Sequence, residues 1–280
     1  MGIFPDLGHF KAVTLLHAGP LTRVFRGVDL RNRLPCVIKV VRCQEENSAL
    51  EKLALGNEIN ILQRALHPAF PKLLGFQLES RPCFIALEMI PGANLRDVLR
   101  SEFRLAESQV ATIIRQILDA LIPLHRTGRT HGDIKPDNIL LEHGNRVRLI
   151  DFGYSTPLGD IPFPGVSLPG TPNYMAPEIC AGNSPLSFAA DLFSLGVTAF
   201  EMLTGYLPYP SGTLGQTLER HQSDPLAGRL NWRGLSFSGL DKLVEKMLSF
   251  PAKGRGSPVE LLDQIIGLEI QLLGKKPIAV

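Results

Sequence analysis

The hydrophobic pattern changes its period at Pro91-Gly92, and this change constrains the fold more than any other feature. Before it come short runs rich in Val, Ile, Leu and Phe, which Gly, Pro or Asn separate, and such runs are typical of β-strands. The runs are 13–16, 22–29, 35–41, 73–78 and 83–88. One helical segment interrupts them, and its apolar residues near helical spacing are Leu50, Leu53, Ile59, Leu62 and Leu66.

After Gly92 the apolar residues recur at helical spacing. One stripe runs from Val110 to Leu124 and another from Leu240 to Leu248. A further helix is predicted over 257–273, because Ser-Pro is a common helix start. We therefore predict an α+β chain in which a small β-rich lobe precedes a larger helical lobe. A cleft between two lobes is a common place for a ligand.

The composition of the 280 residues is that of a folded globular chain, with 44% hydrophobic and 20% charged residues. It excludes a largely disordered, collagen-like or coiled-coil protein. A chain of this length buries enough surface to need neither metal nor disulfide for stability. The formal net charge is only +2, so nucleic acid is not an expected partner.

The cysteines and the first ten residues favour a cytoplasmic chain. Cys36, Cys43, Cys83 and Cys180 are scattered without a C-x-x-C pair, as expected of reduced thiols. The start lacks the basic and apolar regions of a secretory signal. The longest uncharged stretches contain Pro and Gly, so we expect a soluble chain and no membrane contact from this segment.

The strongest motif is H-G-D-I-K-P-D-N at 131–138, which a short hairpin separates from D-F-G at 151–153. Asp133, Asn138 and Asp151 suit phosphoryl transfer, which needs a carboxylate at the acceptor hydroxyl and oxygen ligands for Mg²⁺. The alternative interpretation is a polar turn before a hairpin, with Asn138 as a turn residue. The D-F-G at the expected distance argues against that alternative.

These motifs resemble those of Hanks-type (eukaryotic-type) Ser/Thr protein kinases, most closely the compact bacterial members. The resemblance implies a two-lobed protein kinase fold and a single catalytic domain over 10–273, with an N-lobe at 10–90, a hinge at 88–93 and a C-lobe at 94–273. It also implies ATP with Mg²⁺, Mn²⁺ being an alternative metal, and a protein Ser or Thr as phosphate acceptor.

Within the resemblance, Asp133 is the catalytic base or the residue that orients the hydroxyl. Lys135 lies near the γ-phosphate, and a Lys at this position resembles Ser/Thr rather than Tyr kinases. Asn138 and Asp151 hold the metal.

Lys39 lies in the predicted strand V-I-K-V, where a Lys by itself is commonly an ordinary edge residue. Glu58 follows nineteen residues later, and His67-Pro68 follows Glu58 at a spacing that resembles kinases. The resemblance implies that Lys39 binds the α- and β-phosphates while Glu58 holds its ammonium group. Glu51 lies at the wrong spacing for this role.

The loop that covers the phosphates departs from the family pattern G-x-G-x-x-G-x-V. The sequence at 17–24 is H-A-G-P-L-T-R-V, in which only Gly19 and Val24 remain. Such a loop is expected to be stiffer and a poorer cradle for phosphate.

The hinge is assigned by position. The resemblance implies that Leu87 is the gatekeeper and that the backbones of Glu88 and Ile90 bind adenine.

A third motif, G-T-P-N-Y-M-A-P-E at 170–178, precedes an apolar helix that opens near Asp191. A Pro-rich surface loop before a helix is the alternative interpretation. The resemblance implies that Thr171 lies beside the substrate, that Glu178 pairs with Arg255, and that Asp191 caps the backbone of the catalytic loop.

Two other functions stay open beside the kinase. A pseudokinase scaffold is suggested by the altered glycine loop, although the complete set of catalytic residues argues against it. A small-molecule phosphotransferase is suggested by H-G-D, although segment 170–178 argues against it.

Control and specificity are the least determined properties. Gly132 replaces the Arg that grips an activation-loop phosphate in many kinases (a non-RD loop), so we expect basal activity without loop phosphorylation. Control would then come from a regulatory partner or another part of the chain. Asn94 stands where many Arg-directed kinases carry an acid, so this position does not predict a basic substrate. Asp137 is the remaining candidate for contact with a basic side chain of the substrate.

Overall fold

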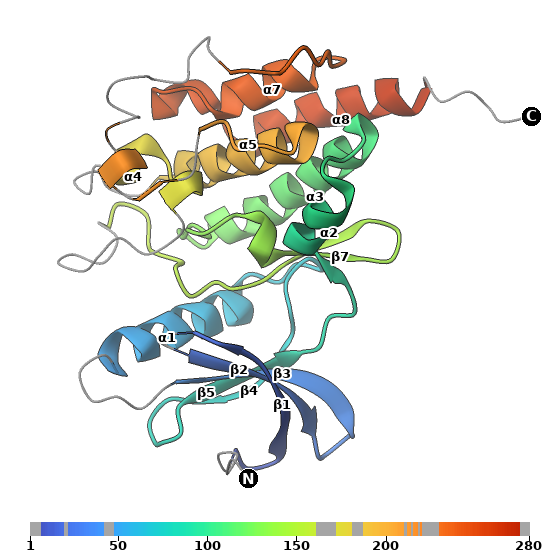
Figure 1. Cartoon of the computed structure of the whole chain (residues 1–280). Helices are drawn as coiled ribbons and strands as arrows, with labels where there is room; N and C mark the ends of the chain where they lie inside the picture. Colours follow the sequence, from blue (N-terminus) through green and yellow to red (C-terminus); the bar gives the residue numbers. More distant parts are fainter. Residues whose placement is uncertain are drawn as a thin grey trace, which may run out of the picture.

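The computed structural model describes residues 7–19, 22–41, 48–160, 172–180, 187–209, 212–213, 215–217, 219 and 230–274 (Figure 1). The predicted α+β arrangement with two lobes is confirmed. An antiparallel sheet and one helix form the N-terminal lobe, and helices dominate the C-terminal lobe.

The N-terminal sheet has the strand order β1-β2-β3-β5-β4. Its strands are β1 (Phe10–Ala18), β2 (Thr22–Asp29), β3 (Leu34–Val41), β4 (Leu73–Gln77) and β5 (Phe84–Glu88). β1 is longer than predicted, because it pairs with β2 along its whole length through two irregularities in register. One face of the sheet carries a small core in which Phe10, Phe25 and Ile38 are buried.

The helix of this lobe, α1 (Ser48–Arg64), lies between the sheet and the helical lobe (Figure 1). Ile59 and Leu62 are buried, as the spacing predicts. Leu53 is half exposed, and Leu66 lies beyond the end of the helix and is 83% exposed. The predicted apolar stripe was therefore too long, because Leu66 belongs to the connection that follows.

The helical lobe is built around α3 and α5, and its own small sheet has the order β6-β7-β8. Its elements are β6 (Ala93–Asn94), α2 (Leu95–Glu102), α3 (Glu107–Arg126), β7 (Ile139–Glu142), β8 (Arg146–Leu149), α4 (Pro177–Cys180), α5 (Phe188–Thr204), α7 (Leu240–Met247) and α8 (Pro258–Gly274). Every residue of α5 from Ala190 to Thr204 is buried. This helix lies between α3 and α7 and anchors the lobe (Figure 1).

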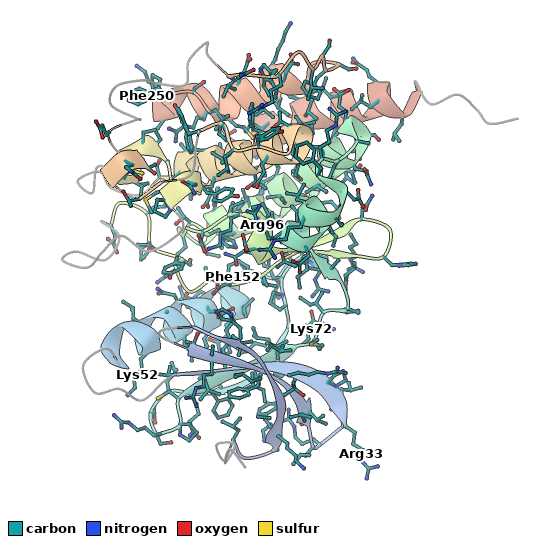
Figure 2. All side chains as sticks on the ribbon, in the orientation of Figure 1. Arg33, Lys52, Lys72, Arg96, Phe152 and Phe250 are labelled. Carbon is teal, nitrogen blue, oxygen red and sulfur yellow. The ribbon has the colours of Figure 1, made fainter. Side chains whose placement is uncertain are left out.

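The two lobes meet at Phe152, which lies between them (Figure 2). Its ring is fully buried and makes an edge contact with Phe70, with 5.0 Å between centroids. The ring of His131 lies 4.8 Å away on the side of the helical lobe.

Among the described helices, none combines the length and apolar character that a membrane crossing needs.

Candidate active site

A cleft of about 740 Å³ separates the lobes and collects most of the predicted site residues. The predicted residues that line it are Val24, Lys39, Leu87, Glu88, Ile90, Lys135, Asn138 and Asp151. Leu16 and His17 line the cleft from β1, whereas Gly19 does not contribute to the lining. The Gly19 amide instead donates to the carbonyl of Thr22 at 2.9 Å and closes the turn between β1 and β2.

Lys39 faces the cleft because side chains alternate along β3. Cys36, Ile38 and Val40 are buried on one face of the strand, which leaves Val37 and Lys39 on the other. The Lys39 ammonium lies 2.9 Å from both carboxylate oxygens of Glu58 in α1. It also donates to Asp151 Oδ1 at 3.1 Å. One cation thus joins β3, α1 and the segment that follows β8.

This ion triad shifts the pKa of its members. Although burial alone would lower the pKa of Lys39, the carboxylates of Asp151 and Glu58 raise it above its ordinary value. The nearby Lys39 ammonium is the main cause that lowers the pKa of Asp151. At neutral pH the site therefore holds an ammonium group and an ionised Asp151.

The loop before β7 gathers a second polar group around Asp133. The turn Pro136–Asn138 folds the chain back, so the amide of Asn138 donates to Asp133 Oδ2 and to the Asp133 carbonyl, both at 2.8 Å. Lys135 donates to the same carboxylate oxygen at 2.6 Å. Asp133 is 5% exposed, so its carboxylate is held in one orientation.

Asp191, in the first turn of α5, fixes the backbone of this loop. Its carboxylate accepts from the amides of His131 at 2.8 Å and Gly132 at 3.0 Å, and from His125 Nε2 at 2.8 Å. Burial would raise the pKa of Asp191, but the hydrogen bond from His125 and the other donors hold it below its ordinary value.

The backbone around Gly132 leaves no room for a side chain. Its φ is +82°, and a Cβ atom would lie 2.4 Å from the carbonyl oxygen of Tyr154. The catalytic loop and the segment after D-F-G therefore approach each other backbone to backbone.

Glu178 and Arg255 form a buried ion pair, with nitrogen–oxygen distances of 2.6 and 2.9 Å. Arg255 is fully buried and also donates to the carbonyls of Ala189 and Ser249. This pair ties α4 to α5 and to the turn before α8. Thr171 lies outside the described residues.

The donor set suits a hard cation that shares its coordination with phosphate. Asn138 uses its amide nitrogen toward Asp133, which leaves its carbonyl oxygen available, and Asp151 adds a carboxylate on the same cleft. The described residues contain no group of three or more His, Cys, Asp and Glu that would hold a metal by themselves. Mg²⁺ commonly binds through one or two carboxylates and substrate phosphates, so the residues fit it.

Two arginines near the cleft, Arg148 and Arg96, were not predicted from the sequence as site residues. Arg148 of β8 pairs with Glu88 at the hinge and with Glu142, and it donates to the carbonyl of Phe70 at 3.1 Å. Arg96 of α2 joins a cluster described below. No local pattern marks either residue, because Glu88 is 60 residues from Arg148 and Glu201 is 105 residues from Arg96.

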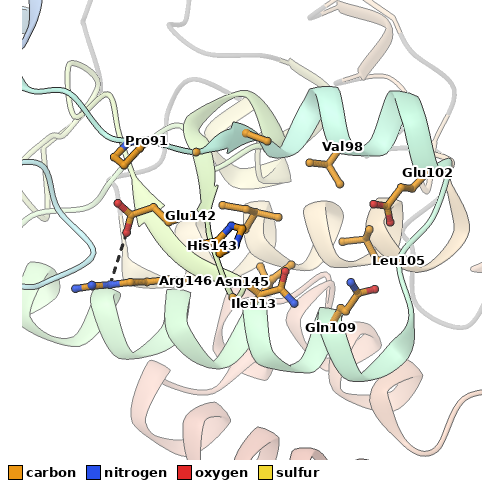
Figure 3. Close-up of a pocket in the computed structure, with 14 residues that line it drawn as sticks. Pro91, Val98, Glu102, Leu105, Gln109, Ile113, Glu142, His143, Asn145 and Arg146 are labelled. Atoms are coloured by element: carbon orange, nitrogen blue, oxygen red, sulfur yellow. Dashed lines mark ion pairs between the residues drawn. The ribbon is translucent and has the colours of Figure 1, made fainter. Parts of the chain in front are cut away.

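A second cavity of about 880 Å³ lies on the helical lobe, between α2, α3 and the β7–β8 turn (Figure 3). Val98, Leu105 and Ile113 contribute apolar surface, and an ion pair between Glu142 and Arg146 stands at one end. It contains none of the predicted site residues.

Comparison with known proteins agrees with this geometry. A family model described as protein kinase domain matches residues 10–265. Similar proteins include the serine/threonine-protein kinase PknD of Mycobacterium tuberculosis, which is 29% identical over 89% of this chain and 38% of that protein. Serine/threonine-protein kinase pkn3 of Myxococcus xanthus is 31% identical over 77% of the chain and 41% of that protein. Serine/threonine-protein kinase ppk11 of Schizosaccharomyces pombe is 32% identical, over 71% of the chain and 63% of that protein.

The chain thus spans less than half the length of PknD and pkn3. The match to the family model nevertheless extends from β1 into α8 and includes both lobes and the cleft between them. The chain therefore belongs to the protein kinase domain family.

Proposed function

We propose that this chain is an ATP-dependent Ser/Thr protein kinase, which transfers the γ-phosphate of ATP to a protein hydroxyl. The observation that carries the proposal is the meeting of Lys39, Asp133, Asn138 and Asp151 around one interlobe cleft. The similar proteins named serine/threonine-protein kinases support the same acceptor class.

Asp133 is proposed to accept the proton of the substrate hydroxyl, or to orient that hydroxyl, during transfer. Lys135, whose ammonium lies 2.6 Å from the Asp133 carboxylate, is proposed to stabilise charge on the transferred phosphate. Lys39 is proposed to bind the α- and β-phosphates, with Glu58 holding it in position.

Asn138 and Asp151 are the proposed ligands of Mg²⁺, with Mn²⁺ as an alternative. When bound, the metal supplies charge neutralisation between the β- and γ-phosphates. The buried Leu87 side chain is the proposed gatekeeper, and the backbones of Glu88 and Ile90 are the proposed adenine contacts.

Gly19 and Val24 remain the proposed covering loop. Thr171 is proposed to lie beside the substrate, while Glu178, Arg255 and Asp191 have structural roles.

The alternatives fit less well. The ion triad around Lys39 and the oriented Asp133 are unnecessary in a scaffold that turns over no nucleotide. Segment 172–180 packs on α5, where Ser194 donates to the Tyr174 carbonyl at 2.8 Å. Because the small-molecule phosphotransferases lack a segment of this kind, its presence favours a protein substrate.

The wider biology is likewise proposed. We infer a cytoplasmic protein with a catalytic domain over 10–273, whose control comes from a regulatory partner or from another part of the chain. We expect neither nucleic acid nor a membrane as a partner of this segment. The buried free thiols of Cys36, Cys83 and Cys180 suit a reducing compartment.

The test is incubation with ATP, Mg²⁺ and a generic protein substrate, followed by mapping of the phosphorylated residues. We expect phosphate on Ser or Thr. Asp133→Asn should retain nucleotide binding and lower turnover by about 10²–10⁴, the usual contribution of a general base. Asp151→Asn should weaken metal-dependent nucleotide binding as well. Wild-type turnover in Asp133→Asn, or no phosphorylation of protein by the wild type, would overturn the proposal.

A further inference from the structure

A cluster of four polar side chains lies next to the proposed acceptor site. It consists of Arg96, Asp137, Tyr174 and Glu201, which come from α2, the Pro136–Asn138 turn, the turn before α4, and α5. Figure 2 shows Arg96 within the helical lobe near α2. We call this group the Arg96 cluster.

Arg96 donates to every other member of the cluster. Its Nη1 lies 2.5 Å from Glu201 Oε1, and its Nε lies 3.2 Å from Asp137 Oδ2. Its Nη2 contacts the Tyr174 hydroxyl, which in turn donates to Glu201 Oε2 at 2.5 Å. Both carboxylate oxygens of Glu201 thus have a donor.

Burial makes this arrangement hard to rearrange. The side chains of Glu201 and Arg96 are 11% and 20% exposed, whereas that of Asp137 is 49% exposed. Burial and the nearby Glu201 raise the pKa of Tyr174, so its phenol stays neutral and keeps its proton for donation. One guanidinium therefore neutralises a buried carboxylate and shares a second, more exposed one.

The cluster adjoins the proposed acceptor site through Asp137. Asp137 belongs to the same short turn as Asn138, lines the cleft, and has its carbonyl held by the Asn94 side chain at 2.6 Å. Because Asn138 of this turn is bonded to Asp133, a peptide whose hydroxyl reached Asp133 would come close to Asp137. The neighbouring Tyr174 belongs to the segment that directly follows Thr171.

We propose that Arg96 is a specificity-determining residue. Its guanidinium group occupies the position between the carboxylates of Asp137 and Glu201 that an Arg or Lys of the substrate would otherwise take. The wild-type enzyme then gains no selectivity for basic residues near the acceptor. This inference rests on the proposed function and narrows its substrate class.

The physical reason is the cost of displacement. A substrate cation that took Glu201 would leave the Arg96 guanidinium partly buried without its closest anion. Without Arg96, the same place holds two carboxylates, one of them buried, with no cation to neutralise them. An incoming Arg or Lys would then form new charge-assisted hydrogen bonds.

The test compares paired Ser/Thr peptides that differ only in having Arg or norleucine at each position near the acceptor. Initial rates with Mg-ATP, and binding of fluorescent forms without ATP, are measured for wild type and Arg96→Gln. Arg100→Gln is the matched control, because Arg100 lies one turn later in α2 and is exposed, pairing only with Asp97 within the described residues.

We expect an Arg/norleucine ratio near one for wild type and Arg100→Gln. In Arg96→Gln the ratio should rise about tenfold at one or more positions, in both rate and binding. The added change Glu201→Gln should cancel the gain. Melting curves accompany the assay, and Arg96→Lys replaces Arg96→Gln if the latter does not fold; its single ammonium cannot bridge all three partners, so a smaller rise is expected.

A strong preference of the wild type for Arg, or an unchanged ratio in the folded variant, would overturn the inference. Absence of turnover in every protein contradicts the proposed function instead. In that event the binding measurement still decides the inference.

Discussion

Gly132 bears on both the regulation of the chain and the packing of its backbone. The missing side chain is the basis of the expectation that activity needs no activation-loop phosphate. The structure adds that the Tyr154 carbonyl occupies the space that a Cβ atom would need. An Arg at this position is therefore excluded by backbone packing as well as absent from the sequence.

Gly132→Ala should destabilise the chain more than Gly128→Ala. Both glycines have positive φ, +82° and +75°, so each substitution costs about 1 kcal/mol through the backbone. Only at Gly132 does the new Cβ meet an atom within contact distance, and the forced shift should add ~2 kcal/mol or more. Urea denaturation of both variants measures the difference, and equal losses would contradict the close approach.

His17, at the start of the altered glycine loop, lines the cleft. His17→Gly should lower the KM for ATP by about two- to tenfold, since one added backbone–phosphate hydrogen bond contributes ~0.5–1.5 kcal/mol. Thr22→Gly is the comparison, because Thr22 pairs with Val41 in the sheet and its carbonyl already closes the turn with Gly19. An unchanged KM in His17→Gly would show that the imidazole does not limit the approach of phosphate.

At the scale of elements, α5 positions the site from inside the helical lobe. Its first turn supplies Asp191 to the catalytic loop, and its last turns supply Glu201 to the Arg96 cluster. The C-terminal end of α3 contributes His125, whose ring stacks on Phe188 with 4.2 Å between centroids. α5 and the end of α3 thus hold the loop that carries Asp133.

Asp191→Asn should lower the free energy of unfolding by roughly 3 kcal/mol at pH 7, because a buried acceptor of three hydrogen bonds loses its charge. The folded pKa of Asp191 lies below the unfolded value of about 3.9, so its contribution is present above that pH. It is lost as the pH falls through the folded pKa. The difference from wild type should therefore shrink below about pH 4.

Denaturation at pH 7 and pH 3 measures this effect. Asp97→Asn is the control, since Asp97 is exposed and should change stability little at either pH. A constant difference for Asp191→Asn would assign its role to packing rather than charge.

At the scale of the whole molecule, the segment after D-F-G is tied to both lobes. Asn57 of α1 donates to the Gly153 carbonyl, and Arg129 joins Asn57 to the Ser155 carbonyl. The backbone amide of Thr130 donates to Thr156 at 3.1 Å.

Replacing Ser155, Thr156 and Ser167 together by Ala should leave activity within about threefold, less than ~0.7 kcal/mol in the barrier. Ser155 is fully buried, its hydroxyl has no hydrogen-bond partner among the described residues, and Thr156 is 8% exposed. Ser167 lies outside the described residues. Initial rates of the triple variant measure the effect; a loss beyond tenfold that acidic substitutions restore would indicate a phosphate receptor elsewhere.

The sequence by itself determined the two lobes, the main strands and helices, and the catalytic motifs. These features have local causes: alternation along β3 places Lys39, and Asn138 follows Asp133 by only five positions, so one turn joins them. Local periodicity does not depend on which distant segment covers a face, so it can be read without the fold.

Only the tertiary structure decided which charged side chains pair with one another. Arg96 and Glu201 are 105 residues apart, and Arg148 and Glu88 are 60 apart. The same holds for the exposure of Leu66 and for the approach of Gly132 to Tyr154. The strength of an ion pair or a backbone contact depends on distance and burial, and packing between remote segments sets both. The specificity proposed for Arg96 therefore depends on the fold, which brings Arg96 of α2 to Glu201 of α5.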